Sequence, residues 1–239
     1  MENMEESYYK ARRRRKKERT KPNVFLLHSF SSFVKAFLAG VMVSVGAIVF
    51  LSVNNKYLGS ALFSMGLFTI FSYGLALFTG RVGYMVVQPF GKNIQLIPVW
   101  LGNLAGTLTC GYIVQLTRVY KKIAKRALTL CEEKLDDGLI SIFILSVFCG
   151  ILMFIAADNF KNATNSVQKY LAIVLPVMVF ILCGFEHCIA NMFYFTVANS
   201  WNFKAVLYIF VMTAGNSFGG IIIPATHKFI GLIRKRLVA

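Results

Sequence analysis

The chain has 239 residues, of which 56% are hydrophobic and 15% are charged, and its formal net charge is +16. Soluble domains carry about a quarter of charged residues, so this composition, with a mean hydropathy of +0.61, excludes an ordinary soluble protein and predicts an all-α integral membrane protein. The five cysteines form no Cys-x-x-Cys pair, so neither a disulfide framework nor a metal site is expected, and no cofactor is expected either.

The first segment of the chain is strongly basic. Lys10–Lys21 holds nine of the 26 basic residues and no aromatic residue, which favours contact with anionic lipid over binding of nucleic acid. A long basic run followed by a full-length apolar span is not typical of a cleaved signal peptide. We therefore assign residues 1–30 to a cytoplasmic tail and residues 31–239 to a single transmembrane domain.

Apolar blocks about 20 residues long follow this tail, which is the length of helix that a bilayer core about 30 Å thick requires. They predict six transmembrane helices at Phe33–Val53, Tyr57–Thr79, Ile94–Leu116, Leu139–Ala157, Tyr170–Val197 and Ala205–Leu232. An even number of spans puts both termini on one side, and their basic residues place that side in the cytoplasm. The polar segment Thr117–Gly138 then lies outside, although it carries six Lys and Arg residues of its own.

The second and fifth spans are predicted to be broken. As one straight helix the fifth would be about 42 Å long, longer than the hydrocarbon layer, and Pro176 and Gly184 favour an interruption. The second span ends in the glycine-rich stretch Gly74–Tyr84. Unwound backbone at membrane depth must be satisfied by protein or by a cavity, so both breaks are expected to face one shared path.

Two short patterns recur along the chain, in the same order and at nearly equal intervals. Gly-Asn-x-x-Gly at 102–106 returns at 215–219, and Gly40–Ala47 resembles Gly150–Ala157. Close packing of helices could explain either pattern alone. Together they predict two three-helix repeats, with the second inserted upside down as in many transporters and channels. The repeats are 33–116 and 139–232.

The most distinctive motif is GFEHCIANMF at residues 184–193. It resembles the signature of the formate–nitrite transporter family, with Cys188 in place of the family's common Ser. Leu-Phe-Thr-Gly at 77–80 resembles the family's loop in the second span, and the Gly-Asn-x-x-Gly patterns resemble its third and sixth spans. The family's usual Cys-Asn in the fourth span is Cys-Gly at 149–150 here. The resemblance extends from about residue 33 to residue 232.

This resemblance implies an aquaporin-like fold and a homopentamer with one pore in each protomer. It also implies passage of small monovalent anions, such as formate, nitrite or hydrosulfide, across the cell (plasma) membrane. It implies no enzymatic reaction and no cofactor. Residues 31–239 would then form a single channel domain in the lipid bilayer.

His187 is the central candidate, because an ionisable residue in a membrane span is functional by default and an imidazole titrates near pH 6.5. We expect it to meet the anion midway and to donate a hydrogen bond or a proton, so protons are expected partners. A packing histidine bonded to a neighbour is the alternative. Thr79 is expected to contact the anion, Asn191 to orient the imidazole, and Glu186 to anchor the broken backbone through hydrogen bonds.

Leu77 and Phe78 are expected to form a hydrophobic constriction on the cytoplasmic side and Phe193 one on the outer side; ordinary core packing is the alternative for all three. By the resemblance, Lys134 takes the place of the family's outer-vestibule lysine and would attract anions over about 10 Å. A solvated loop lysine is the alternative.

Three classes of function compete. The first is an anion channel or proton-coupled carrier for formate or nitrite, or for hydrosulfide or another weak-acid anion. A neutral-solute channel of the aquaporin type is disfavoured because the chain has no Asn-Pro-Ala. An intramembrane enzyme using Glu186 and His187 is disfavoured because the chain lacks His-Glu-x-x-His and any Ser or Cys elbow motif.

Overall fold

The computed structural model describes residues 24–238; most of the predicted basic tail, including Lys10–Lys21, lies outside the described residues. All regular structure in the described part is helical. Its elements are α2 (Val24–Ser52), α3 (Lys56–Ser72), α4 (Phe78–Arg81), η1 (Val82–Val86), α5 (Phe90–Asn93), α6 (Leu96–Gln115), α7 (Tyr120–Asp136), α8 (Leu139–Asn162), α9 (Ser166–Leu182), α10 (Cys188–Val197) and α11 (Phe203–Val238).

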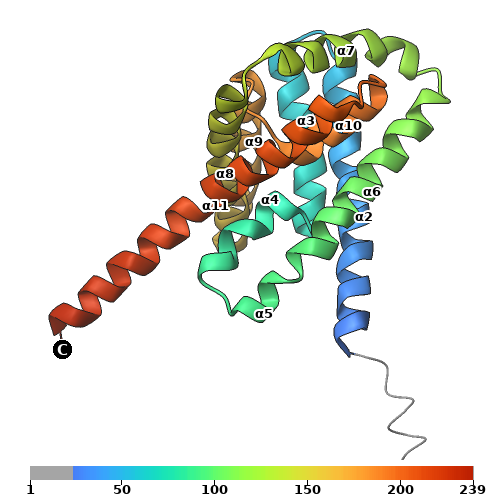
Figure 1. Cartoon of the computed structure of the whole chain (residues 1–239). Coiled ribbons are helices and arrows are strands. Elements are labelled where there is room, and N and C mark those ends of the chain that lie inside the picture. Colours follow the sequence, from blue (N-terminus) through green and yellow to red (C-terminus); the bar gives the residue numbers. More distant parts are fainter. Residues whose placement is uncertain (1–23, 239) are drawn as a thin grey trace, which may run out of the picture.

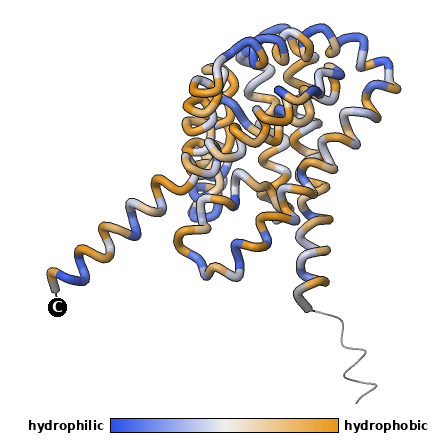
Figure 2. The backbone as a smooth tube through the Cα atoms, viewed as in Figure 1, coloured by the Kyte–Doolittle hydropathy of each residue, from blue (hydrophilic) through white to orange (hydrophobic). Residues whose placement is uncertain are grey.

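Within residues 24–238, four stretches of helix are long and apolar enough to cross a membrane. They are Leu26–Ser52, Phe90–Gln115, Leu139–Asn162 and Phe203–Leu237. Figure 2 shows hydrophobic residues along these helices and a largely hydrophilic α7. In Figure 1, α7 lies at one end of the molecule, while α5 and the described ends of the chain lie toward the opposite end.

No single helix covers the predicted second or fifth span. Residues 73–77, here called the first loop, separate α3 from α4, and residues 183–187, the second loop, separate α9 from α10. Each loop turns at a glycine with positive φ, Gly74 at 62° and Gly184 at 69°, a conformation that glycine adopts without steric cost. The expectation that Pro176 helps to interrupt the fifth span is wrong, because α9 continues through it to Leu182.

The second loop is held by one buried asparagine of α11. Asn216 accepts a hydrogen bond from the Cys188 backbone N–H (2.9 Å) and donates to the Glu186 and Ser146 carbonyls (2.8 Å each). A single amide therefore satisfies backbone groups on both sides of the break, as unwound backbone away from water requires.

The first loop is held in the same way by Asn103 of α6. Its amide accepts from the Phe78 N–H (2.9 Å) and donates to the carbonyls of Ala36 (2.8 Å) and Ala76 (2.9 Å). Each of these three partners has a counterpart among the three partners of Asn216. Each counterpart lies the same number of residues further along the chain. The recurring Gly-Asn pattern thus has a second role besides packing, which is to fasten the loops.

The glycines of the same pattern let helices approach closely. A Cβ added at Gly106 would overlap the Phe37 carbonyl of α2, and one at Gly219 would overlap the Val147 carbonyl of α8. Phe37 and Val147 are separated by the same interval as the partners of the two asparagines. The α2–α6 and α8–α11 pairs therefore pack backbone against backbone, as small residues permit.

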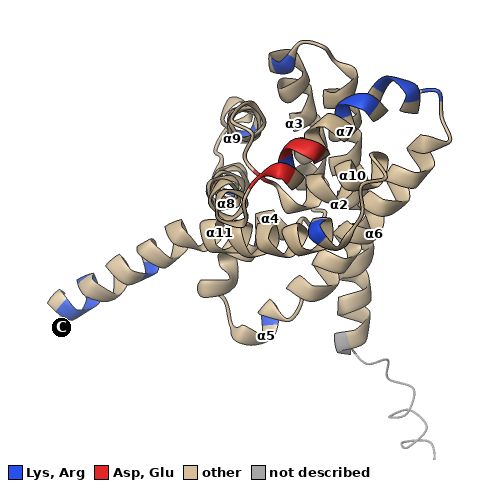
Figure 3. Ribbon diagram, turned by 45° about the horizontal axis from the view of Figure 1, so that its top comes forward, with Lys and Arg blue, Asp and Glu red and all other residues tan. Residues whose placement is uncertain are grey.

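The polar segment Thr117–Gly138 is largely helical. Ile123, Ala127 and Cys131 are spaced four residues apart in α7 and are fully buried, so this amphipathic helix lies on the molecule with one face inward. Arg126 donates to the carbonyls of Phe50 and Val53 at the end of α2 and lies 4.5 Å from the centre of the Phe50 ring. Figure 3 shows basic residues along α7 and acidic residues near its C-terminal end.

Candidate anion site

The two loops bring Thr79 and His187 together. Thr79 Oγ1 lies 2.9 Å from His187 Nε2, and both side chains are buried. His187 is also the N-cap of α10, where its Nδ1 accepts the Ala190 N–H at 3.1 Å. In a neutral imidazole one nitrogen accepts and the other donates, so the proton lies on Nε2 and is donated to Thr79 Oγ1. The Thr79 hydroxyl hydrogen is then left to donate to a ligand.

His187 lines a cavity of about 250 Å³ beneath α7. The ring of Phe180 stacks on the imidazole, with 5.7 Å between the ring centroids. Phe50 and Tyr194 also line the cavity. The imidazole is therefore not walled off within the core, although only 2% of the residue is exposed.

Lys134 and Glu186 form an ion pair beside this cavity. Lys134 Nζ donates to both carboxylate oxygens of Glu186, at 2.8 and 2.9 Å, and the two side chains are 12% and 4% exposed. Lys134 lines the cavity as expected of a vestibule residue, but its charge is partnered rather than free. The carboxylate of Glu186 does not anchor the broken backbone. The backbone of Glu186 does, because its carbonyl accepts from Asn216 and its N–H donates to the Leu145 carbonyl.

The expectation that Asn191 orients the imidazole is wrong for its side chain. Asn191 Nδ2 donates to Glu186 Oε2 at 2.7 Å and lies 3.2 Å from Met212 Sδ. A carboxylate is a stronger acceptor than a neutral ring nitrogen, which accounts for this preference. Asn191 Oδ1 is buried without a partner among the described residues.

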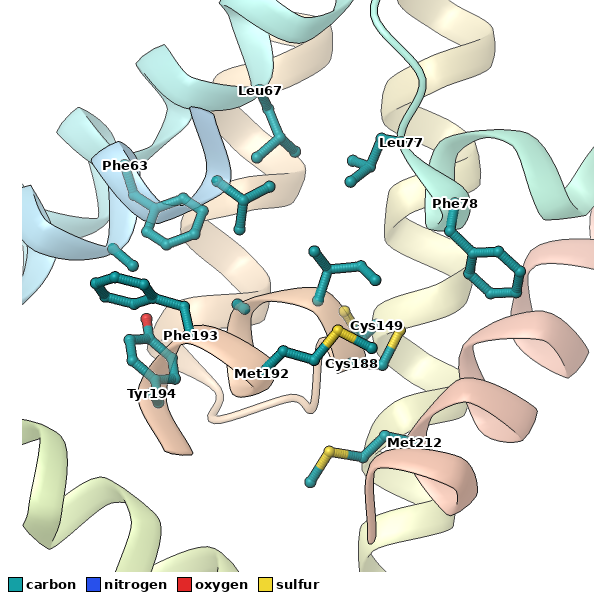
Figure 4. Close-up of a cluster of buried hydrophobic side chains, with 14 of the residues drawn as sticks. Phe63, Leu67, Leu77, Phe78, Cys149, Cys188, Met192, Phe193, Tyr194 and Met212 are labelled. Carbon is teal, nitrogen blue, oxygen red and sulfur yellow. The ribbon is translucent and has the colours of Figure 1, made fainter. Parts of the chain in front are cut away.

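The expected constriction residues are all buried. Leu77 is the last residue of the first loop and Phe78 starts α4; both are buried. Phe193 is fully buried and does not line the cavity, so an outer constriction does not form at this residue. Figure 4 shows it among buried side chains near Tyr194, which does line the cavity.

Comparison with known proteins matches residues 11–230 to the family model described as formate/nitrite transporter. The chain belongs to the formate/nitrite transporter family. It is therefore a membrane-transport protein of the helical, multi-pass class.

Individual members of this family are only modestly similar in sequence. The chain is 27% identical to the formate channel FocA of Escherichia coli K12 over 186 residues, which cover 70% of this chain but only 65% of FocA. It is 27% identical to the uncharacterized transporter YrhG of Bacillus subtilis over 231 residues, 86% of each. A solved pentameric formate channel with formate bound has a TM-score of 0.72 at 22% identity, covering 86% of this chain and 98% of that one, which shows the fold.

The departure from the family's Cys-Asn at 149–150 has a steric explanation here. A Cβ added at Gly150 would overlap the carbonyl of Asn216. In this member of the formate/nitrite transporter family, α8 and α11 thus approach too closely for any side chain at residue 150.

Several residues of the site gave no functional signal in the sequence. Phe50 and Phe180 were two aromatic residues among many, and their place at the cavity depends on how α2 and α9 pack. Asn216 was recognised only as part of a packing pattern. In the described part of the chain, no group of three or more His, Cys, Asp or Glu residues could hold a metal ion.

Proposed function

We propose that this protein is a transmembrane channel for small monovalent anions, formate or nitrite first among them. The observation that carries the proposal is the contact of Thr79 with His187, which lines the cavity beneath α7. The match to proteins named formate channels supports formate as the substrate.

The Thr79–His187 contact supplies a hydrogen-bond donor for an anion inside the membrane. An anion at the bilayer centre costs at least several kcal/mol without compensation. Thr79 donates its hydroxyl hydrogen to the anion, while Nε2–H of His187 donates to the same hydroxyl and strengthens it as a donor, since chains of hydrogen bonds polarise one another. Protonating Nδ1 would break its bond with the Ala190 N–H, so hydrogen-bond donation is favoured over proton donation by this ring.

The same proposal includes the membrane arrangement. Four long helices and the two interrupted pairs, α3–α4 and α9–α10, form six spans in two inverted repeats with an aquaporin-like fold. The recurrence of equivalent contacts around Asn103 and Asn216 supports the repeats. Basic residues at both termini favour a cytoplasmic location for both termini. The solved pentameric formate channel, whose fold this chain shares, supports a homopentamer.

The test is anion flux through proteoliposomes holding the full-length chain. Formate and nitrite should pass, whereas Thr79→Val should lower the flux about tenfold or more and Thr79→Ser, which keeps the hydroxyl, should retain most of it. An equal loss for Val and Ser, or unchanged flux for both, contradicts the proposed role. A competition series of formate, nitrite, hydrosulfide, lactate and chloride ranks the substrates, and passage of glycerol with exclusion of all five would favour a neutral-solute channel.

Dependence on pH separates hydrogen-bond donation from proton donation. If His187 only donates a hydrogen bond, formate flux at a fixed formate concentration should not follow protonation of a ring between pH 6 and 8. If it donates a proton, flux should change across that range, and His187→Gln should remove the change.

A further inference from the structure

A second cavity lies at the end of the molecule opposite α7. Its volume is about 630 Å³. The beginning of α2, the segment α4–η1, the beginning of α6 and the end of α8 enclose it. It is more than twice as large as the cavity beside His187.

The lining of this cavity is strongly basic. Its basic residues are His28, Lys35, Arg81, Lys92 and Lys161, and no Asp or Glu among the described residues lines it. We call this cavity the basic cavity. With the histidine neutral, its formal charge is +4.

These charges lack carboxylate partners. The one ion pair found in the described part of the chain joins Lys134 to Glu186, at the other end. Asp158 lies nearby but accepts the hydroxyl of Tyr84 at 2.9 Å. Lys161 lies over the ring of Tyr84, 5.1 Å from its centre.

The cavity beside His187 has a different balance. It is lined by two lysines and three carboxylates, which give a formal charge of −1. These residues are Lys56, Glu133, Lys134, Asp137 and Glu186. Of these two cavities, only the basic cavity therefore has a lining with a net positive formal charge.

We propose that the basic cavity binds multivalent phosphate-type oxyanions, which lodge there without passing and block entry of smaller anions from that side. The binding part stands by itself, while the blocking part depends on the channel function proposed above.

Valence favours such a ligand over a monovalent anion. A potential of about 2 kT, within the range that clustered charges create, enriches a monovalent anion roughly sevenfold and a trivalent anion roughly 400-fold. Arg81 is half-buried, and a guanidinium presents a fork of donors that fits two phosphate oxygens. Ser31 and Gln88 in the same lining add neutral hydrogen-bonding groups.

The position of Arg81 connects the basic cavity to the anion site. It lies two residues after Thr79 in the short helix α4. Leu77 and Phe78, which directly precede Thr79 in the chain, are buried. A phosphate group held by Arg81 thus occupies the approach to Thr79 and is too large and too charged to continue.

Binding is tested on the purified full-length protein in detergent without added lipid. Calorimetry at pH 8 compares inorganic phosphate, pyrophosphate and tripolyphosphate with chloride at matched ionic strength. Affinity should rise with valence. Arg81→Gln and, separately, the exposed Lys92→Gln should weaken tripolyphosphate binding about tenfold, whereas Lys121→Gln in α7 should not. Binding no stronger than that of chloride, or an equal loss in the α7 variant, overturns the proposal.

Two further measurements locate the effect and its source. In planar bilayers, tripolyphosphate should reduce the formate current only when it is added on the α5 side. If it blocks from both sides, or from neither side while formate passes, the proposal that it blocks entry is overturned. If no monovalent anion passes although tripolyphosphate binds, the channel function fails and the binding site stands. If tripolyphosphate no longer binds to the protein in phosphatidylglycerol nanodiscs, lipid headgroups occupy the site. A soluble ligand is then excluded.

Discussion

At the scale of single residues, the imidazole of His187 is fixed at both of its nitrogens. Nδ1 accepts from the Ala190 N–H and Nε2 contacts Thr79. The ring therefore needs no help from Asn191, whose amide holds Glu186 instead. The network around the site consists of two separate units, a neutral donor pair and a buried ion pair.

The ion pair gives the first prediction. Lys134→Met and Glu186→Gln should each lower the free energy of unfolding by about 3 kcal/mol or more, because each leaves a buried charge without its partner. The double variant should lose less than the sum of the two. Melting can be followed with a thiol-reactive dye, since Cys131, Cys149 and Cys188 are buried in the folded protein. Strictly additive losses would show that the two side chains do not interact.

Cys131 gives a prediction about reactivity. Burial raises the pKa of its thiol to about 12, and only the thiolate reacts with alkylating agents. Alkylation of the folded protein should therefore stay slow between pH 7 and 10. In the unfolded chain, where the ordinary pKa is about 8.5, it should rise steeply over the same range. Mass spectrometry of the peptide holding Cys131 measures both, and rapid alkylation of the folded protein at pH 9 would contradict the assigned burial.

At the scale of elements, the two loops are fastened by equivalent asparagines. Asn103 and Asn216 each satisfy three backbone groups with one side chain. This explains why a short segment can leave the helical path in a protein interior. Each loop depends on a helix that comes later in the chain, so loop shape and helix packing form together.

Removing either amide tests this dependence. Asn216→Ala leaves three buried backbone groups unpaired, each costing about 1–3 kcal/mol, and Asn103→Ala should be destabilised by a similar amount in the same melting assay. Asn216→Ala should also reduce anion flux more strongly, because only the second loop carries Glu186 and His187. A stable, fully active Asn216→Ala variant would refute the role of this residue.

The glycines between helices give a matched pair of variants. Gly219→Ala should destabilise by about 1–3 kcal/mol, the usual cost of overpacking, because its Cβ would overlap the Val147 carbonyl. Gly231→Ala meets nothing within 4 Å and lies in the same helix, so the higher helix propensity of Ala should make it neutral or stabilising by up to about 1 kcal/mol. The comparison of their melting temperatures separates packing from propensity.

At the scale of the whole molecule, the described chain has two unlike mouths. The mouth beneath α7 has nearly balanced charges, and the mouth near α5 is basic. Both lie in a molecule whose flanks carry exposed Phe and Leu side chains and a groove between α6 and α11 lined by Trp100 and Phe210. Exposed apolar surfaces of this kind mark contact with a membrane or with other protein chains.

The proposed homopentamer gives a prediction at this scale. Native mass spectrometry of the detergent-solubilised protein should show a complex of five times the 26.8 kDa chain mass. It should persist after dilution, because obligate interfaces bury large apolar areas. A monomer, or an assembly of another size, under conditions that preserve the melting transition would contradict the pentamer.

The sequence could predict local features of this fold but not the partners of its site residues. The length and hydropathy of the apolar segments were enough to predict the long helices. Gly74 and Gly184 indicated where the two loops turn. The Thr79–His187 contact joins residues 108 positions apart, and a hydrophobic pattern contains no information about such pairs. Pro176 was misleading because α9 continues through it to Leu182. Phe193 was misleading because the rotation of α10, which depends on its packing, buries this side chain.

Because the two loops are equivalent, residue 77 is a position at which the site could be engineered. Leu77 is the counterpart of His187 in the first repeat, at the same place in a backbone fastened by the same hydrogen bonds, and its side chain takes part in none of them. At this position the second repeat carries an imidazole and the first repeat an apolar side chain. Chemical groups could be exchanged at residue 77 to retune what the passage admits, with the frame around it left intact.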